Sequence, residues 1–168
     1  MPAAIFGLYL QAAGADGAGA AALVLAVMLD LRARHWLSMA ARSGIGARSE
    51  DEVQRVLDPV RREGWRVRHS VSWRGRGDVD SVVVAPGGVA FAIETKTRSY
   101  DERHLRRVRE QAVWLARRRR IRTVVPVLCI VRAAGVERCE NGVLVVSVDR
   151  LVAVLWAVGT RRAMAGRG

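Results

Sequence analysis

Lysine, cysteine and histidine are all scarce in this chain of 168 residues, which has one lysine, two cysteines and three histidines. Cys129 and Cys139 match no zinc-binding or redox spacing. The histidines, His35, His69 and His104, are scattered, and no two stand at the spacing of metal ligands. These scarcities argue against a zinc or thiol redox site. They predict a reduced, cytosolic protein without disulfides.

The single lysine, Lys96, stands among 27 arginines. Lysine carries a compact charge on a flexible stem, and its pKa is readily tuned by its surroundings. Arginine is a planar fork that stays protonated. A lone lysine in such a background therefore indicates a site that a guanidinium cannot serve, unless it survives by accident.

The charge is strongly positive and unevenly distributed. The formal net charge is +12 and the isoelectric point is about 11.5. Ten arginines but only three acidic residues lie between Thr97 and Arg122. Such a surface is typical of proteins that bind phosphate groups, and it favours nucleic acid as the partner. An anionic membrane surface would also attract a protein of this charge.

The first 43 residues form an apolar segment that we expect to be helical. Its uninterrupted apolar run, residues 17–29, is 13 residues long, shorter than the ~20 that span a bilayer. The longer stretch of residues 3–31 contains Gln11 and Asp16, and a central aspartate is costly in a membrane. The chain also lacks the basic start of a signal peptide.

Two roles stay open for this segment. It can be a packing or dimerising helix, which makes the protein cytoplasmic and a possible homodimer. Alternatively, residues 3–31 anchor the protein in the inner, cytoplasmic membrane. In that case the basic cluster Arg32, Arg34 and His35 would keep the downstream domain in the cytoplasm.

From residue 44 the pattern predicts one compact α/β domain that ends near residue 158, followed by a basic flexible tail, residues 159–168. After a loop, Ser49 and Glu52 form a capping box that begins a helix. Pro59 interrupts its last turn, and Gly64 ends it. Strands are predicted at 65–71, 78–85, 89–97, 123–131 and 142–148, with helices from about Tyr100 to Arg120 and from Asp149.

The chemistry lies on the strands at 78–85 and 89–97. Side chains alternate along a strand, so Glu94 and Lys96 share one face. Pairing through the Pro86-Gly87-Gly88 turn brings Asp80 close to them. Glu50, on the inward face of its helix, completes an all-oxygen site suited to Mg²⁺, for which Mn²⁺ can substitute.

Such an ion polarises a phosphodiester and lowers the pKa of a bound water. Lys96 can orient or deprotonate that water, or neutralise charge in the transition state. A solitary Glu-x-Lys is more often an exposed strand pair without a role. The combination with Asp80, Glu50 and the sole lysine is what favours a catalytic site.

Five motifs, in this order, resemble the nuclease-related domain (NERD) family of the PD-(D/E)XK nuclease superfamily. They are G-A-x-x-E, G-W, G-D-V-D-S-V-V-V-A-P-G-G-V, I-E-T-K-T and Q-A-V-W-L, between Gly46 and Leu115. The resemblance implies a restriction-endonuclease-like core, with a mixed central β-sheet flanked by helices, and metal-dependent DNA cleavage. The sequence departs from the superfamily pattern at Val79, where proline is usual before the aspartate.

Carried to this sequence, the resemblance makes Glu50 the helical acidic residue, Asp80 and Glu94 the metal ligands, and Lys96 the catalytic lysine. It makes Gln111 an auxiliary polar residue. The implied function is an Mg²⁺-dependent endo- or exodeoxyribonuclease.

Arginines next to this site are predicted to bind the phosphates of DNA, a contact that carries little sequence information. RNA stays open as a substrate, because it has the same phosphodiester. The alternative is a basic module that binds nucleic acid without cutting it and that could be membrane-anchored. The predicted nucleic-acid-binding residues are Arg74, Arg76, Arg98, Arg103, Arg106, Arg107 and Arg109, with Arg117 to Arg120 further along the helix.

Overall fold

The structure is a computed structural model, and it describes residues 16–75 and 77–165. It divides into two compact units, Met1–Ile45 and Gly46–Gly168. The division falls close to the boundary predicted after residue 43. All of the predicted site residues lie in the second unit.

The described part of the first unit is helical and belongs to helix α2, Asp16–Leu57. Many of its large apolar side chains are exposed: Val24, Leu25, Val27, Met28, Leu29, Leu31, Trp36, Leu37, Met39 and Ile45. Among the helices of the described residues, none combines the length and apolarity needed to cross a bilayer. The predicted candidate, residues 3–31, lies partly outside the described residues.

The prediction that a helix begins at Ser49 after a loop is wrong. Helix α2 is continuous through Gly44 and Gly46, although glycine costs about 1 kcal/mol in a helix interior relative to alanine. With helical turns before it, Ser49 is not an N-cap. Its side chain is instead buried, with its Oγ 3.1 Å from Thr97 Oγ1. A tertiary contact has taken the place of the predicted cap.

The end of this helix is as predicted. Helix α2 stops at Leu57, and Pro59 lies in the short 3₁₀ helix η1, Asp58–Glu63. Gly64 caps it in the left-handed conformation, with φ 85°, which glycine adopts without steric cost. The chain then enters the first strand.

The remaining elements of the second unit follow the predicted order with one addition. They are β1 (Arg66–Ser72), β2 (Asp78–Val84), β3 (Ala90–Lys96), α3 (Glu102–Arg119), β4 (Val124–Ile130), β5 (Glu137–Glu140), β6 (Val143–Ser147) and α4 (Val148–Ala165). Strand β5 was not predicted. Helix α4 runs on to Ala165, past the residue 159 at which a tail was predicted.

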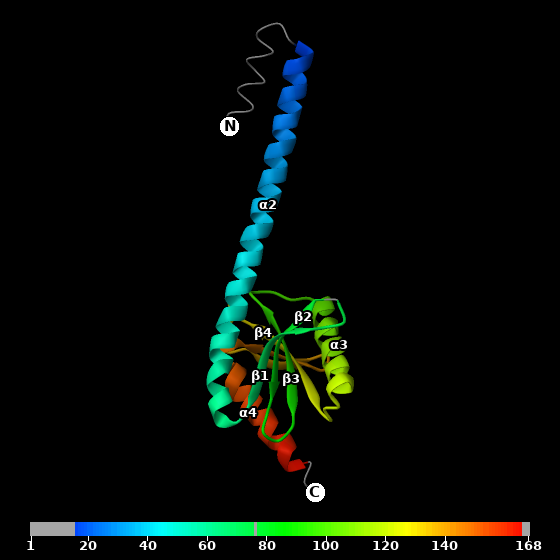
Figure 1. Cartoon of the computed structure of the whole chain (residues 1–168). Coiled ribbons are helices and arrows are strands. Elements are labelled where there is room, and N and C mark those ends of the chain that lie inside the picture. Colours follow the sequence, from blue (N-terminus) through cyan, green and yellow to red (C-terminus); the bar gives the residue numbers. More distant parts are fainter. Residues whose placement is uncertain (1–15, 76, 166–168) are drawn as a thin grey trace. The chain divides into compact units, whose positions relative to one another are not determined.

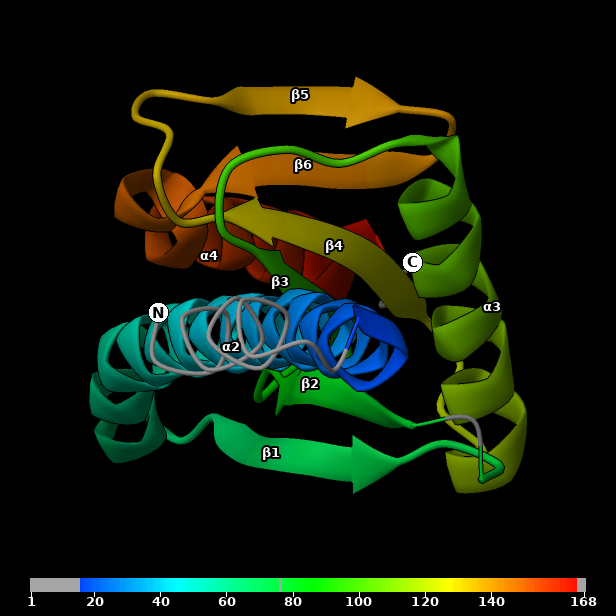
Figure 2. The same cartoon turned by 90° about the horizontal axis from the view of Figure 1, so that it is seen from above.

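The strands form one mixed sheet in the order β1-β2-β3-β4-β6-β5. Strands β3, β4 and β6 are parallel, and the other neighbours pair antiparallel. Figure 2 shows this order, with α3 along one side of the sheet. The predicted α/β class, a mixed sheet flanked by helices, is confirmed.

Apolar side chains fill both faces of the sheet. On one face, the end of α2, η1 and α4 pack over a cluster that includes Leu57, Trp65, Phe91, Ile93 and Leu155. On the other, α3 packs over two smaller clusters (Figure 1). One of them, the Trp73 cluster, contains Trp73, Val79, Val82, Ala92, Ala112, Trp114 and Leu115. The candidate site lies on this α3 face.

Candidate active site

Glu94 and Lys96 form an ion pair on strand β3. Lys96 Nζ donates a hydrogen bond of 2.9 Å to Glu94 Oε1. The Glu94 side chain is only 5% exposed, and that of Lys96 is 25% exposed. The strand places both on one face, and the residue between them, Thr95, is also buried. The only lysine of the chain therefore contacts a buried carboxylate.

Asp80 reaches the same place from strand β2. The pairing of β2 with β3 ends at Ser81 and Ile93. Beyond this last pair, the main-chain amide of Thr95 donates a hydrogen bond of 2.7 Å to Asp80 Oδ2. The Asp80 carboxylate thus accepts the hydrogen bond of this N–H group, which would otherwise lack a partner where β2 and β3 separate.

Gln111, on helix α3, is fully buried and fixes Glu94 from the opposite side. Its Nε2 donates to Glu94 Oε2 at 3.2 Å and to the main-chain oxygen of Asp78 at 3.3 Å. Its Oε1 is buried and has no hydrogen-bond partner among the described residues. Both oxygens of Glu94 are therefore hydrogen-bonded, one to Lys96 and one to Gln111.

Burial raises the pKa of the Asp80 carboxyl to about 7, and repulsion from Glu94 adds to the effect. The Thr95 N–H and Lys96 oppose this rise, whereas Glu50 contributes to it. Repulsive carboxylates held together in this way are typical of sites that bind a cation or handle protons.

Glu50, which was predicted on the inward face of its helix, is half-buried on α2. Burial raises the pKa of its carboxyl, as does repulsion from Glu94, while the Lys96 ammonium lowers it. Glu50 is thus electrostatically linked to the strand residues. Among the described residues, however, no three acidic, histidine or cysteine side chains come together closely enough to hold a metal ion.

From the sequence, Arg107 was predicted only as one of several arginines that bind DNA phosphates. Its Nε lies 3.9 Å from Glu94 Oε2, and its Cζ lies 5.6 Å from the centre of the Trp73 ring. The Arg107 Nε is buried without a hydrogen-bond partner among the described residues. The signal that could have singled it out is its spacing, because Arg107 lies four residues before Gln111 and therefore on the same side of the helix.

The chemistry of the site fits a magnesium ion held by two carboxylates, since Mg²⁺ is commonly bound by one or two carboxylates together with water molecules. Asp80 Oδ1 takes no hydrogen bond from the described residues. Each Glu94 oxygen accepts one hydrogen bond and so keeps capacity to bind a cation.

The other predicted arginines are spread around this centre. Arg74, Arg106 and Arg109 line an open cavity of about 520 Å³ beside Trp73. Arg109 also donates to the main-chain oxygen of Asn141 at 3.1 Å. Arg103 is exposed on α3, Arg98 lines a separate cavity near Tyr100, and Arg76 lies outside the described residues.

Trp73 is buried among the other side chains of the Trp73 cluster. It is not free to stack on a base.

The profile of the nuclease-related domain (NERD) family matches residues 45–153. The chain belongs to this family. The match spans every predicted site residue, including Glu50, Asp80, Glu94, Lys96 and Gln111, and confirms the family that the motifs indicated. No curated protein and no solved structure matches the chain at a significant level. Membership gives the protein a nuclease-related character.

Proposed function

We propose that this NERD protein is an Mg²⁺-dependent nuclease that hydrolyses phosphodiester bonds of DNA. The observation that carries the proposal is the meeting of Asp80 and Glu94 with Lys96. The two carboxylates come from adjacent strands, and the only lysine donates to Glu94 Oε1 at 2.9 Å.

Asp80 and Glu94 would hold the metal ion, with Glu50 beside them. When bound, Mg²⁺ polarises the phosphodiester and lowers the pKa of a bound water. Gln111 and the Thr95 amide, which donate to Glu94 and Asp80, keep the two carboxylates oriented. Mn²⁺, with similar preferences for oxygen ligands, would substitute.

Lys96 supplies a mobile positive charge at the reacting phosphate. As an ammonium it can orient the attacking water or neutralise charge in the transition state, and as a neutral amine it can accept a proton from that water. An arginine here would be wider and would stay protonated. Arg107, held over Trp73 near Glu94, adds a second cation on the substrate side of the site.

DNA would lie along the basic surface of α3 and the β1–β2 turn. Arg74, Arg106 and Arg109 line one cavity there, and their contacts to phosphates would be sensitive to salt and nearly independent of sequence. RNA has the same phosphodiester, so the cleavage assay includes it.

The test is cleavage of plasmid, single-stranded DNA and RNA with Mg²⁺, with Mn²⁺ and with EDTA. Wild type is compared with Lys96→Arg and Asp80→Asn, and with Arg55→Gln, an exposed arginine on α2, as a matched control. We expect cutting with either metal and none with EDTA. Both site variants should lose activity, while the control keeps it.

Retained activity in Lys96→Arg would contradict the role given to the lysine. Cutting by Asp80→Asn at the wild-type rate would overturn the metal site.

A binding module that does not cut is the second candidate. It is favoured by the formal net charge of +12 and by the absence of a three-ligand group among the described residues. Such a module would bind DNA equally well with and without Mg²⁺. It would lose affinity when the α3 arginines are removed, but not in Lys96→Ala.

A further inference from the structure

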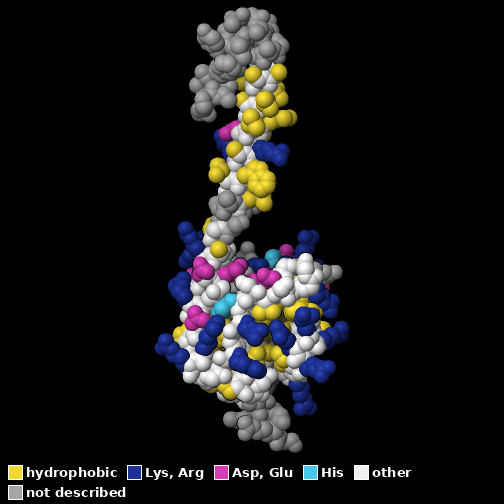
Figure 3. Space-filling view, in the orientation of Figure 1, with side chains coloured by type: hydrophobic (Ala, Val, Ile, Leu, Met, Phe, Trp, Pro, Cys, Tyr) yellow, Lys and Arg dark blue, Asp and Glu magenta, His cyan; other side chains and the backbone are white. Residues whose placement is uncertain are grey.

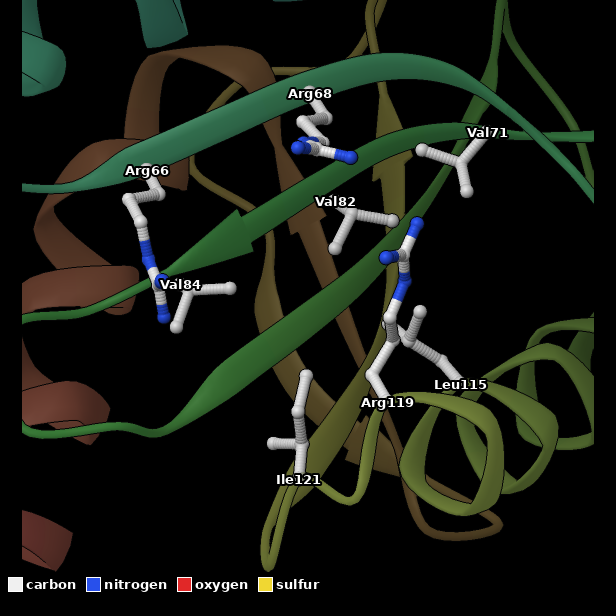
Figure 4. A pocket seen from close by; sticks show the side chains of 8 residues that line it. All are labelled: Arg66, Arg68, Val71, Val82, Val84, Leu115, Arg119 and Ile121. Carbon is white, nitrogen blue, oxygen red and sulfur yellow. The ribbon is translucent and has the colours of Figure 1, made fainter.

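A cavity of about 230 Å³ lies between strands β1 and β2 and the C-terminal end of helix α3. We call it the β1–α3 pocket. It is separate from the Asp80–Glu94–Lys96 centre, and none of its lining residues belongs to that centre. Figure 4 shows its apolar side chains with three arginines around them, Arg66, Arg68 and Arg119. Its lining includes Arg66, Arg68, Arg119, Val82, Val84 and Ile121.

The register of β1 with β2 and the end of helix α3 together bring the three arginines to one place. Arg66 pairs with Val84 and Arg68 pairs with Val82, so each arginine of the edge strand β1 stands beside a valine on the same face. Arg119, the last residue of α3, reaches toward Val82 from the other side (Figure 4). Three guanidinium groups therefore border one small cavity.

No carboxylate balances these charges. The cavity has no acidic lining residue. Among the residues that the structure describes, the three arginines make no side-chain hydrogen bond or ion pair. Several other arginines do have carboxylate partners, for example Arg34, Arg61, Arg138 and Arg150. The face drawn in Figure 3 shows basic side chains gathered around exposed apolar ones. Guanidinium groups without a carboxylate partner can form charge-assisted, bidentate hydrogen bonds with an anion such as a phosphate.

The floor of the cavity selects a flat apolar group. Val82 and Val84 project from the same face of β2, and such side chains form an even surface. At about 230 Å³ the cavity is smaller than the ~300–1,000 Å³ of pockets for drug-sized ligands. It therefore suits a single ring system better than a long chain.

We propose that the β1–α3 pocket binds one unpaired nucleotide of a nucleic-acid strand. The base lies on the valines and Ile121, and the adjoining phosphates lie between the arginines. A lipid carboxylate would bring one charge to three guanidiniums, whereas a strand brings a phosphate on each side of the base. The proposal rests on the proposed nuclease function and narrows its substrate to a strand that is single where it meets this pocket.

The position of the pocket agrees with such a strand. Val82 pairs with Ala92 and Val84 with Ala90, two and four residues before Glu94 on strand β3. At ~3.3 Å per residue the floor lies roughly 7–13 Å along the strands from Glu94. That separation is short enough for neighbouring nucleotides of one strand to reach both the pocket and Glu94.

The test measures binding by fluorescence anisotropy in EDTA, so that no cleavage is needed. The probes are a labelled single strand, a duplex of the same length, and a strand of the same length made of abasic sugar-phosphate. Wild type is compared with Arg68→Gln/Arg119→Gln and with Ile121→Glu, which adds a carboxylate to the pocket. The control Arg55→Gln/Arg122→Gln removes two exposed arginines outside it.

We expect the pocket variants to bind the single strand about tenfold more weakly (~1.4 kcal/mol), and the control to change little. Duplex affinity should fall no further than in the control. Wild type should prefer the normal strand to the abasic one, and Ile121→Glu should lose that preference. An equal loss for single strand and duplex would overturn the proposal. Unchanged affinity for the single strand in the pocket variants would also overturn it, even if the protein bound free deoxyadenosine monophosphate tightly.

The two proposals fail separately. The protein could bind the single strand selectively, lose this binding in the pocket variants and yet never cut. That result would overturn the nuclease function and leave the pocket assigned. Metal-dependent cutting with unchanged strand affinity in the variants would overturn the pocket alone.

Discussion

Arg107 lies over the ring of Trp73, with its Cζ 5.6 Å from the ring centre, while its Nε is 3.9 Å from Glu94 Oε2. The indole is buried and holds the guanidinium in place by a cation–π contact. If Glu94 acts in catalysis as proposed, a cation fixed in this way beside it needs no rearrangement when a phosphate arrives. This sets Arg107 apart from the exposed arginines of the same helix.

Replacing Arg107 with glutamine should lower the maximal cleavage rate by roughly 100-fold, the scale of losing one fixed electrostatic contact in the transition state. Arg103→Gln, an exposed position on the same helix, removes the same charge and should mainly weaken substrate binding. Steady-state kinetics with a defined oligonucleotide separates the two effects. Equal losses in the two variants would make Arg107 a simple phosphate contact.

Gln111→Leu should impair both stability and activity. The change removes the donor that reaches Glu94 Oε2 and the main-chain oxygen of Asp78, and it leaves the buried Glu94 Oε2 without this hydrogen bond. We expect a loss of ~1–3 kcal/mol in the free energy of unfolding, measured with urea. Gln111→Glu should lower activity further, because it sets a new carboxylate against Glu94. If Gln111→Leu folds and cuts like wild type, the amide does not position Glu94.

Asp80 should make the metal-free protein less stable as the pH rises from about 4 to about 7. Its pKa is raised from 3.8 to about 7 in the folded state, so the folded protein binds more protons than the unfolded chain in this range. The free energy of unfolding then falls with increasing pH. Asp80→Asn, which keeps the shape and an acceptor oxygen, should be more stable than wild type at pH 8 by roughly 2–4 kcal/mol.

Urea unfolding at pH 4 and pH 8 in EDTA measures this difference. Asp51→Asn, at an exposed aspartate of α2, serves as the control for the loss of one negative charge. A destabilised Asp80→Asn at pH 8 would show that the buried charge is compensated in the folded protein.

Magnesium should raise the melting temperature of wild type. A ligand that binds only the folded state stabilises it by ~2.7 kcal/mol at 100 times its dissociation constant. Asp80→Asn and Glu94→Gln should lose most of this effect, whereas Asp51→Asn should keep it. Differential scanning fluorimetry with Mg²⁺ and with Ca²⁺ measures the shifts. An undiminished shift in both site variants would place the ion elsewhere.

Most of the second unit could be predicted because its signals are local. The alternating pattern fixed the face shared by Glu94 and Lys96, and the Pro86-Gly87-Gly88 turn led to the pairing that brings Asp80 alongside. Strand β5 was missed because Glu137–Glu140 carries no buried apolar residue. Yet Asn141-Gly142, with φ 49° and 77°, is a typical two-residue hairpin turn, and it should have predicted a strand on each side.

The rest depended on contacts between distant elements. Ser49 followed by Glu52 reads as a capping box, but the turns before it are helical and the Ser49 hydroxyl meets Thr97. The approach of Arg107 to Glu94 and the gathering of Arg66, Arg68 and Arg119 depend on how α3 lies on the sheet. Spacing within one element places Arg66 beside Arg68 and Arg107 beside Gln111, but it does not show which residues of another element they meet.

The scarcity of lysine also has a practical use. Lys96 carries the only side-chain amine of the chain, and it is 25% exposed. Reductive methylation with ¹³C-formaldehyde would therefore label the α-amino group and one ε-amine, the one that donates to Glu94. The NMR signal of that methylated amine would report on the candidate site without the introduction of any foreign residue, and its response to metal and to oligonucleotide could be followed in the same sample.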